Sequence, residues 1–142
     1  MPRFVLLYHD CPPGYERASH WDLMLEFGEM LRTWAIPQLP SAWHVAHQIT
    51  KTLFENCPAL SVRNHVLAER LSDHRRDYLH LEGELSRNRG TVRRVAEGDF
   101  VVKWETQLGW YLTLSGSTID GDIEFDLPTG RGQCWTITLK DR

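Results

Sequence analysis

Short segments rich in aromatic and β-branched residues follow one another along most of this chain, each bounded by residues that favour turns. They span residues 4–9, 20–27, 30–36, 90–95, 100–104, 109–114, 123–127 and 134–139. Segments of this length and composition are typical of β-strands. Because short strands separated by turns form closed or two-layered sheets, the sequence predicts a mainly β fold, a compact antiparallel β-barrel of about eight strands.

Two glycine-centred turns and one helical segment add detail to this pattern. Phe27-Gly28-Glu29 and Glu97-Gly98-Asp99 are expected to form hairpin turns between antiparallel neighbours, because glycine suits a tight reversal. Residues 41–57 instead carry apolar side chains at helical spacing behind a candidate N-cap, Ser41, which predicts one short helix. Three tryptophans are expected in the packed interior, namely Trp104, Trp110 and Trp135.

Length and composition limit the class of protein. A chain of 142 residues has the length of a single domain, residues 1–142. No apolar run approaches the ~20 residues that a membrane span requires, and the N-terminus lacks the pattern of a secretory signal. Cytoplasm is therefore the expected compartment, with no membrane partner. Cys11, Cys57 and Cys134 are widely spaced and are expected to be reduced thiols.

The charge is uneven along the chain. The net charge of −3 argues against a protein that binds nucleic acid by charge alone. Residues 63–94, however, carry eight arginines and five acidic residues, a local charge of +3. A solvated charged face and a face directed at phosphate fit this stretch equally well.

His20-Trp21-Asp22 lies within one apolar segment, and His9 ends the preceding one. In a strand, His20 and Asp22 project from the same face about 6.6 Å apart, at ~3.3 Å rise per residue. A neighbouring strand can add His9. Two imidazoles and a carboxylate leave open positions on a divalent ion such as Mn²⁺, Fe²⁺ or Zn²⁺. The same residues also suit an ordinary salt-bridged or hydrogen-bonded pair.

Six segments together are more specific than this motif. They are residues 3–10, 20–26, 31–37, 73–78, 82–92 and 132–139. In this order they resemble the patterns RFVVxKH, HYDFRLE, LKSWAVPKGPS, EDHPLEY, FEGxIPxGxYGxGTV and GxWxLxR of the 3′-phosphoesterase domain of bacterial and archaeal DNA ligase D. The resemblance implies metal-dependent removal of a 3′-ribonucleotide or 3′-phosphate from DNA primer ends in DNA repair. It also implies Mn²⁺ as the cofactor, with Zn²⁺ or Co²⁺ as alternatives.

The resemblance also implies roles for individual residues. His9, His20 and Asp22 map to the metal ligands, and His74 and Tyr78 map to the residues beside the phosphate. His74 is then expected to hold or protonate a phosphoryl oxygen, and Tyr78 to donate a hydrogen bond to the leaving oxygen. Without the resemblance, His74 suits a surface histidine in a charged run. The implied partners are nucleic-acid 3′ ends in a primer–template, with a separately encoded ligase or polymerase as a candidate.

Met24 departs from the pattern, because the family has arginine at this position on the ligand-bearing strand face. Losing a buried phosphate-binding cation costs on the order of 2–5 kcal/mol, so weakened catalysis is expected. Met24 should border the phosphate, and Met24→Arg should raise activity about tenfold. Arg17, in the enlarged loop before His20, and Arg76 are expected to contact phosphate instead, while Ser72 replaces an acidic residue of the pattern.

Two other functions remain open. Met24 and Ser72 favour a non-catalytic module that keeps the phosphoesterase-like fold and binds metal, nucleic-acid ends or a protein partner. Alternatively, His20, Asp22 and His74 match the facial triad of a non-haem Fe(II) oxygenase. A chain of 142 residues is short for such an enzyme, and His9 would then have no role.

Overall fold

The computed structural model describes residues 1–40, 43, 61–62, 64–127 and 134–140. Within these ranges the structure is mainly β. The strands are β1 (Arg3–Asp10), β2 (His20–Phe27), β3 (Met30–Ile36), β4 (Ser61–Val62), β5 (His65–Arg75), β6 (Gly83–Glu84), β7 (Thr91–Thr106), β8 (Gly109–Gly116), β9 (Gly121–Asp126) and β10 (Cys134–Lys140), with a 3₁₀ turn, η1 (Arg76–Leu79), after β5. None of the helices in the described part of the chain is long and apolar enough to cross a membrane.

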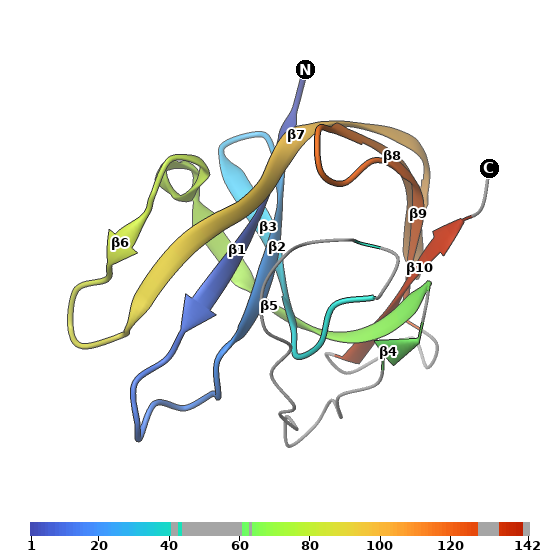
Figure 1. Ribbon diagram of the computed structural model, residues 1–142. Helices are drawn as coiled ribbons and strands as arrows, with labels where there is room; N and C mark the ends of the chain where they lie inside the picture. The colour runs from blue at the N-terminus through green and yellow to red at the C-terminus, as the bar shows by residue number, and fades with distance from the viewer. Residues whose placement is uncertain (41–42, 44–60, 63, 128–133, 141–142) are drawn as a thin grey trace.

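Eight of these strands close into a ring of antiparallel hydrogen bonding. Their order is β1-β2-β3-β5-β10-β9-β8-β7, and β7 pairs again with β1 (Figure 1). The two-residue strands β4 and β6 extend the sheet beside β5 and β7. The mainly β fold of about eight antiparallel strands is confirmed. The helix predicted for residues 41–57 lies outside the described residues, apart from Trp43.

Several strands agree with the sequence prediction, and one long strand was missed besides the two-residue strands β4 and β6. β2 and β3 have the predicted bounds, and the turn between them is confirmed, since Phe27 pairs with Met30 and Gly28 has a positive φ of 63°. The missed strand is β5, an eleven-residue segment with many charged side chains. It bridges β3 and β10 and therefore completes the ring.

The hairpin predicted at Glu97-Gly98-Asp99 is wrong. β7 runs without a turn from Thr91 to Thr106, and Gly98 pairs with Phe4 of β1 and with Gly116 of β8. A Cβ atom on Gly98 would lie 2.2 Å from the carbonyl oxygen of Ser115. Glycine is needed here because two backbones approach closely where β7 passes from β1 to β8.

Aromatic side chains fill the interior of the ring. The Trp34 ring lies 4.6 Å from Phe125, 5.3 Å from Trp110 and 5.9 Å from Trp135, measured between ring centroids. Burial of Trp110 and Trp135 is confirmed, whereas Trp104 is 48% exposed and stacks on Tyr111. The interior position expected for Trp104 is therefore wrong.

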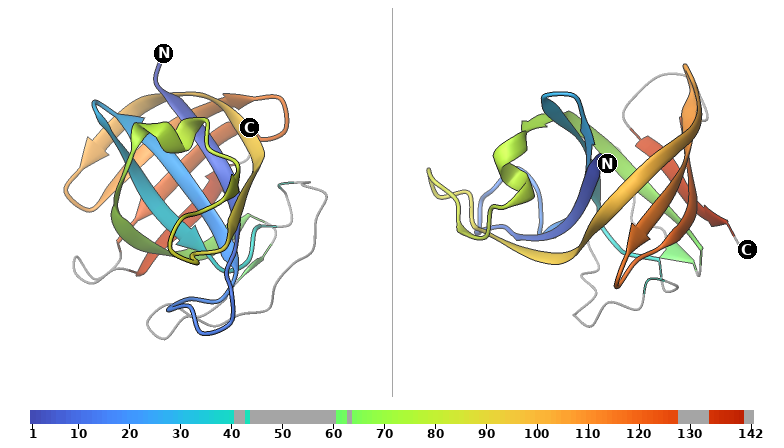
Figure 2. Two further views of the ribbon diagram at one scale, coloured as in Figure 1. Left: turned by 90° about the vertical axis from the view of Figure 1, so that its left-hand side faces the viewer. Right: turned by 90° about the horizontal axis from the view of Figure 1, so that it is seen from above.

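A second apolar cluster covers the opposite face of β1 and β2. Val5, Leu7 and Met24 on these strands pack against Tyr78 and Leu79 of η1, together with further apolar residues of this cluster. Figure 2 shows η1 and the following segment lying across this outer face. Since side chains alternate along a strand, His9, His20 and Asp22 lie on the same outer face, at the end that this apolar cluster does not include.

Gly98→Ala should destabilise the fold, because the added methyl group meets backbone atoms of β8 that cannot move independently. Overpacking of this kind costs about 1–3 kcal/mol, which is measurable as a lower midpoint of urea unfolding. Ser115→Ala, at an exposed position in the paired strand, is the matched control and should change stability by less than about 0.5 kcal/mol. Equal midpoints for both variants would contradict the close approach.

Candidate functional site

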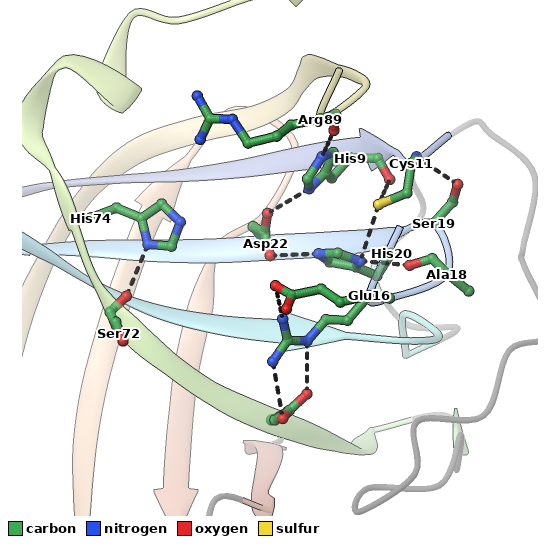
Figure 3. A network of polar contacts seen from close by, with 12 residues as sticks. His9, Cys11, Glu16, Ala18, Ser19, His20, Asp22, Ser72, His74 and Arg89 are labelled. Carbon is green, nitrogen blue, oxygen red and sulfur yellow. Dashed lines mark hydrogen bonds and ion pairs between the residues drawn. The ribbon is translucent and has the colours of Figure 1, made fainter. Parts of the chain in front are cut away.

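The register of β1 and β2 brings three polar side chains together. His9 pairs directly with His20, and Leu7 pairs with Asp22. All three polar side chains are buried, with 7%, 2% and 3% of His9, His20 and Asp22 exposed. Figure 3 shows both imidazoles directed at the Asp22 carboxylate. The structure therefore groups the three residues that the sequence singled out as candidate metal ligands.

Backbone carbonyls orient both imidazoles. His20 Nδ1 donates to the carbonyl of Ala18 at 2.8 Å, and His9 Nε2 donates to the carbonyl of Arg89 at 2.7 Å. Because a carbonyl only accepts, these nitrogens carry the protons, and His20 Nε2 and His9 Nδ1 face Asp22. They lie 3.0 Å from Asp22 Oδ1 and 3.7 Å from Oδ2. Second partners of this kind are what fix the tautomer of metal-binding histidines.

Asp22 is charged although it is buried. Burial alone would raise the pKa of its carboxyl, but the neighbouring charge of His20, followed by His9, outweighs burial and lowers that pKa. The pKa of His20 is raised, since its interactions with Asp22 outweigh the opposing effect of burial. Asp22 Oδ1 is close to His20 Nε2 but has no partner in hydrogen-bond geometry. A buried carboxylate oxygen without a well-directed donor fits a position for a cation.

Cys11 adds a possible metal ligand that the sequence pattern had not singled out. Its Sγ lies 3.9 Å from His20 Nδ1, and one ligand atom from each of His9, Cys11 and His20 lies within 4.8 Å of the others. Burial alone would raise the pKa of the thiol, but hydrogen bonds with His20 and His9 lower it. The signal in the sequence was the His9-x-Cys11 spacing. The group of His9, Cys11 and His20 could therefore hold a metal ion. Its third ligand would be the Cys11 thiolate, in place of the Asp22 carboxylate.

A pocket of about 400 Å³ opens beside these side chains. Its lining includes His9, His20, Asp22 and His74, so β5 contributes to the same pocket as β1 and β2. His74 Nδ1 donates to the carbonyl of Ser72 at 2.9 Å, and the Tyr78 ring packs edge-on against His74 at 5.0 Å between centroids. Ser72 thus orients His74 through its backbone. Tyr78 lies against His74 and lines an adjoining pocket.

The two arginines expected to contact phosphate are both paired with carboxylates. Arg17 lines the pocket but binds Glu69 through two bonds, Nε–Oε1 at 3.0 Å and Nη2–Oε2 at 3.2 Å. Arg76 lies 2.6 Å from Glu26 and lines neither this pocket nor the adjoining one. Much of their charge is therefore compensated within the protein.

Met24 does not border the pocket, so that expectation is wrong. Its side chain is 0% exposed within the second apolar cluster. Strand parity does place Met24 on the same face as His20 and Asp22. However, η1 and the segment after it cover this part of the face, so Met24 is shielded from the pocket.

Buried imidazoles, a carboxylate and a thiol beside a polar pocket define a candidate metal-binding domain. The family model of the DNA ligase D 3′-phosphoesterase domain matches residues 14–134. The chain therefore belongs to the DNA ligase D 3′-phosphoesterase domain family, as its motifs suggested, and its function is related to 3′-phosphoesterase activity. The match contains His20, Asp22, His74 and Tyr78, whereas His9 precedes it. No curated protein matches the chain.

The burial of Met24 reverses the effect expected for Met24→Arg. An arginine at this position would place an unpaired charge among apolar side chains, so we expect a loss of stability on the order of 3 kcal/mol, measured by urea unfolding. Met24→Leu, which keeps volume and polarity, should cost less than about 1.5 kcal/mol. A stable Met24→Arg protein with raised activity would show instead that the side chain reaches the pocket.

Proposed function

We propose that residues 1–142 form one metal-dependent 3′-phosphoesterase domain that removes a 3′-ribonucleotide or 3′-phosphate from DNA primer ends during repair. His9, His20 and Asp22 hold the divalent ion in this proposal, and Mn²⁺ is the expected ion. The supporting observation is that carbonyl-oriented imidazoles meet a buried carboxylate in a pocket shared with His74. Family membership supports the phosphoester chemistry.

The chain's own residues divide the remaining tasks. When bound, the divalent ion supplies an activated water and polarises the phosphate. His74 Nδ1 donates a hydrogen bond to the backbone carbonyl of Ser72, which leaves Nε2 for the substrate. When Nε2 also carries a proton, it would hold or protonate a phosphoryl oxygen. Tyr78 packs against His74, so it supports that ring and supplies a phenol for the leaving oxygen. The ligand is a nucleic-acid 3′ end, the candidate partner is a separately encoded ligase or polymerase, and the proposed compartment is cytoplasmic.

A second candidate is a non-catalytic module that binds a metal ion or nucleic-acid ends. The pairing of Arg17 with Glu69 and of Arg76 with Glu26 favours it, because both cations are compensated before any phosphate arrives. Binding without turnover would distinguish this module from the enzyme. The family match favours phosphoester chemistry over the Fe(II) oxygenase alternative.

The central test uses Mn²⁺-loaded protein and a primer–template that ends in one 3′-ribonucleotide. The natural protein should shorten the primer, and His20→Ala and Asp22→Ala should lower the rate about a hundredfold or more because they remove ion ligands. Circular dichroism should show an intact fold, and calorimetry should show that Mn²⁺ no longer binds. Asp120→Ala, an exposed carboxylate between β8 and β9, is the control. Full activity of the ligand variants, or in chelator, would refute the assignment.

The absorption spectrum of Co²⁺-loaded protein distinguishes Asp22 from Cys11 as the third metal ligand beside His9 and His20. If Asp22 is the third ligand, Co²⁺-loaded protein should lack the near-ultraviolet absorption of a thiolate–cobalt bond, and Cys11→Ser should keep its Mn²⁺ affinity. Hard ions such as Mn²⁺ prefer the carboxylate, whereas thiolate selects softer ions. An intense sulfur–cobalt band that disappears in Cys11→Ser would assign the ion to His9, Cys11 and His20 instead.

A further inference from the structure

A second pocket adjoins the candidate metal centre. The two pockets share Ser72 and His74 of β5, so they meet at these two residues. The second pocket is further lined by Tyr78 of η1 and by Ser86, Arg87 and Arg89 from the segment between β6 and β7. A ligand lying across His74 would therefore contact both pockets.

The second pocket is also lined by Asp73 and Arg75, and only part of its positive charge is compensated by carboxylates. Five arginines line the two pockets, and three of them form ion pairs, Arg17 with Glu69, Arg70 with Asp73 and Arg75 with Asp77. Arg87 and Arg89, by contrast, have no carboxylate partner among the residues that the structure describes. Within this described part of the chain, Arg89 donates to neutral acceptors alone, the carbonyl and hydroxyl oxygens of Ser86 at 2.9 and 3.0 Å.

The segment that carries these two arginines has an unfavourable backbone and is tied to the metal centre. Arg87 and Asn88 have positive φ angles of 60° and 54°, a region that residues other than glycine rarely adopt. The segment is closed by the Leu85 N–H, which donates to the carbonyl of Gly90 at 2.8 Å. The carbonyl of Arg89 accepts a hydrogen bond from His9 Nε2. The Arg89 side chain extends to the side where His74 lies (Figure 3).

We propose that the second pocket binds a backbone phosphate of the nucleic-acid strand that leads to the 3′ end, through Arg87 and Arg89. This inference rests on the proposed function and specifies how the substrate is bound. Uncompensated guanidinium groups bind phosphate oxygens by charge-assisted hydrogen bonds. The strand then reaches the metal centre across His74, and the terminal phosphate lies in the first pocket.

The test compares an oligonucleotide ending in a 3′-phosphate with the matching nucleoside 3′-monophosphate, which lacks a strand. Arg87→Gly and Arg89→Ala should each raise KM for the oligonucleotide about tenfold, and its kcat/KM should fall more than that of the mononucleotide. The salt slope of oligonucleotide binding should decrease by about 0.7 for each arginine–phosphate interaction that the substitution removes. Arg87→Gly also relieves the positive φ, so its melting temperature should not fall, and a binding defect cannot be attributed to unfolding.

Arg93→Ala is the matched control. Arg93 is an exposed arginine of β7 whose side chain lies near the Tyr8 ring and lines neither pocket. The Arg93→Ala substitution should leave the preference for the oligonucleotide over the mononucleotide unchanged. Equal decreases on both substrates in Arg87→Gly and Arg89→Ala would overturn the proposal, since the arginines would then serve the terminal phosphate. No decrease on either substrate, or the same selective decrease in Arg93→Ala, would also overturn it.

Strand binding can be measured without turnover. An oligonucleotide ending in a 3′-hydroxyl is followed by fluorescence anisotropy with the natural protein and the three arginine variants. If no hydrolysis occurs but Arg87→Gly and Arg89→Ala weaken this binding, the phosphate subsite stands and the proposed enzymatic function fails. If hydrolysis occurs and the two variants bind as tightly as the natural protein, the subsite proposal fails while the enzymatic function stands.

Discussion

The pairing of β1 on both of its edges determines the ring and the candidate site together. On one edge β1 pairs with β2, which sets His9 opposite His20. On the other edge it pairs with β7, which sets His9 opposite Val92 and closes the ring. A shift of one residue in either register would turn His9 towards the opposite face of the sheet. The aromatic interior of the ring makes such a shift costly, because Phe4 and Leu6 would leave it.

The same alternation of side chains gives the sheet two different faces, and charge pairing then decides which arginines near the site are available. The histidines and Asp22 stand where the cover of η1 ends, and backbone carbonyls orient the imidazoles there. Arg17 lies close to a carboxylate of β5, whereas Arg89 finds only neutral acceptors among the described residues. The distribution of carboxylates, more than the number of arginines, therefore determines which guanidinium groups would be available to the proposed substrate.

Periodicity and turn residues were sufficient to predict part of the local structure of this chain. The bounds of β2 and β3, the turn at Gly28, and the common face of His20 and Asp22 all follow from residues close in sequence. Motif order also indicated the family. β5 was missed because its charged residues hide the alternation of Val66 and Ala68, which point inwards.

Only the tertiary structure decided which neighbours each residue meets. Gly98 and its neighbours resemble a turn in sequence, but Gly98 lies where β7 pairs with both β1 and β8. The close approach of the backbones explains why glycine stands at this position. Met24 lies on the same strand face as His20 and Asp22, yet η1 covers it. Cys11 could act as a metal ligand only because the pairing of β1 with β2 brings His9 and His20 together beside it. Arg87 stands apart only because three other arginines that line the pockets form ion pairs. Burial and charge compensation depend on segments far apart in sequence, whereas strand parity depends on adjacent residues alone.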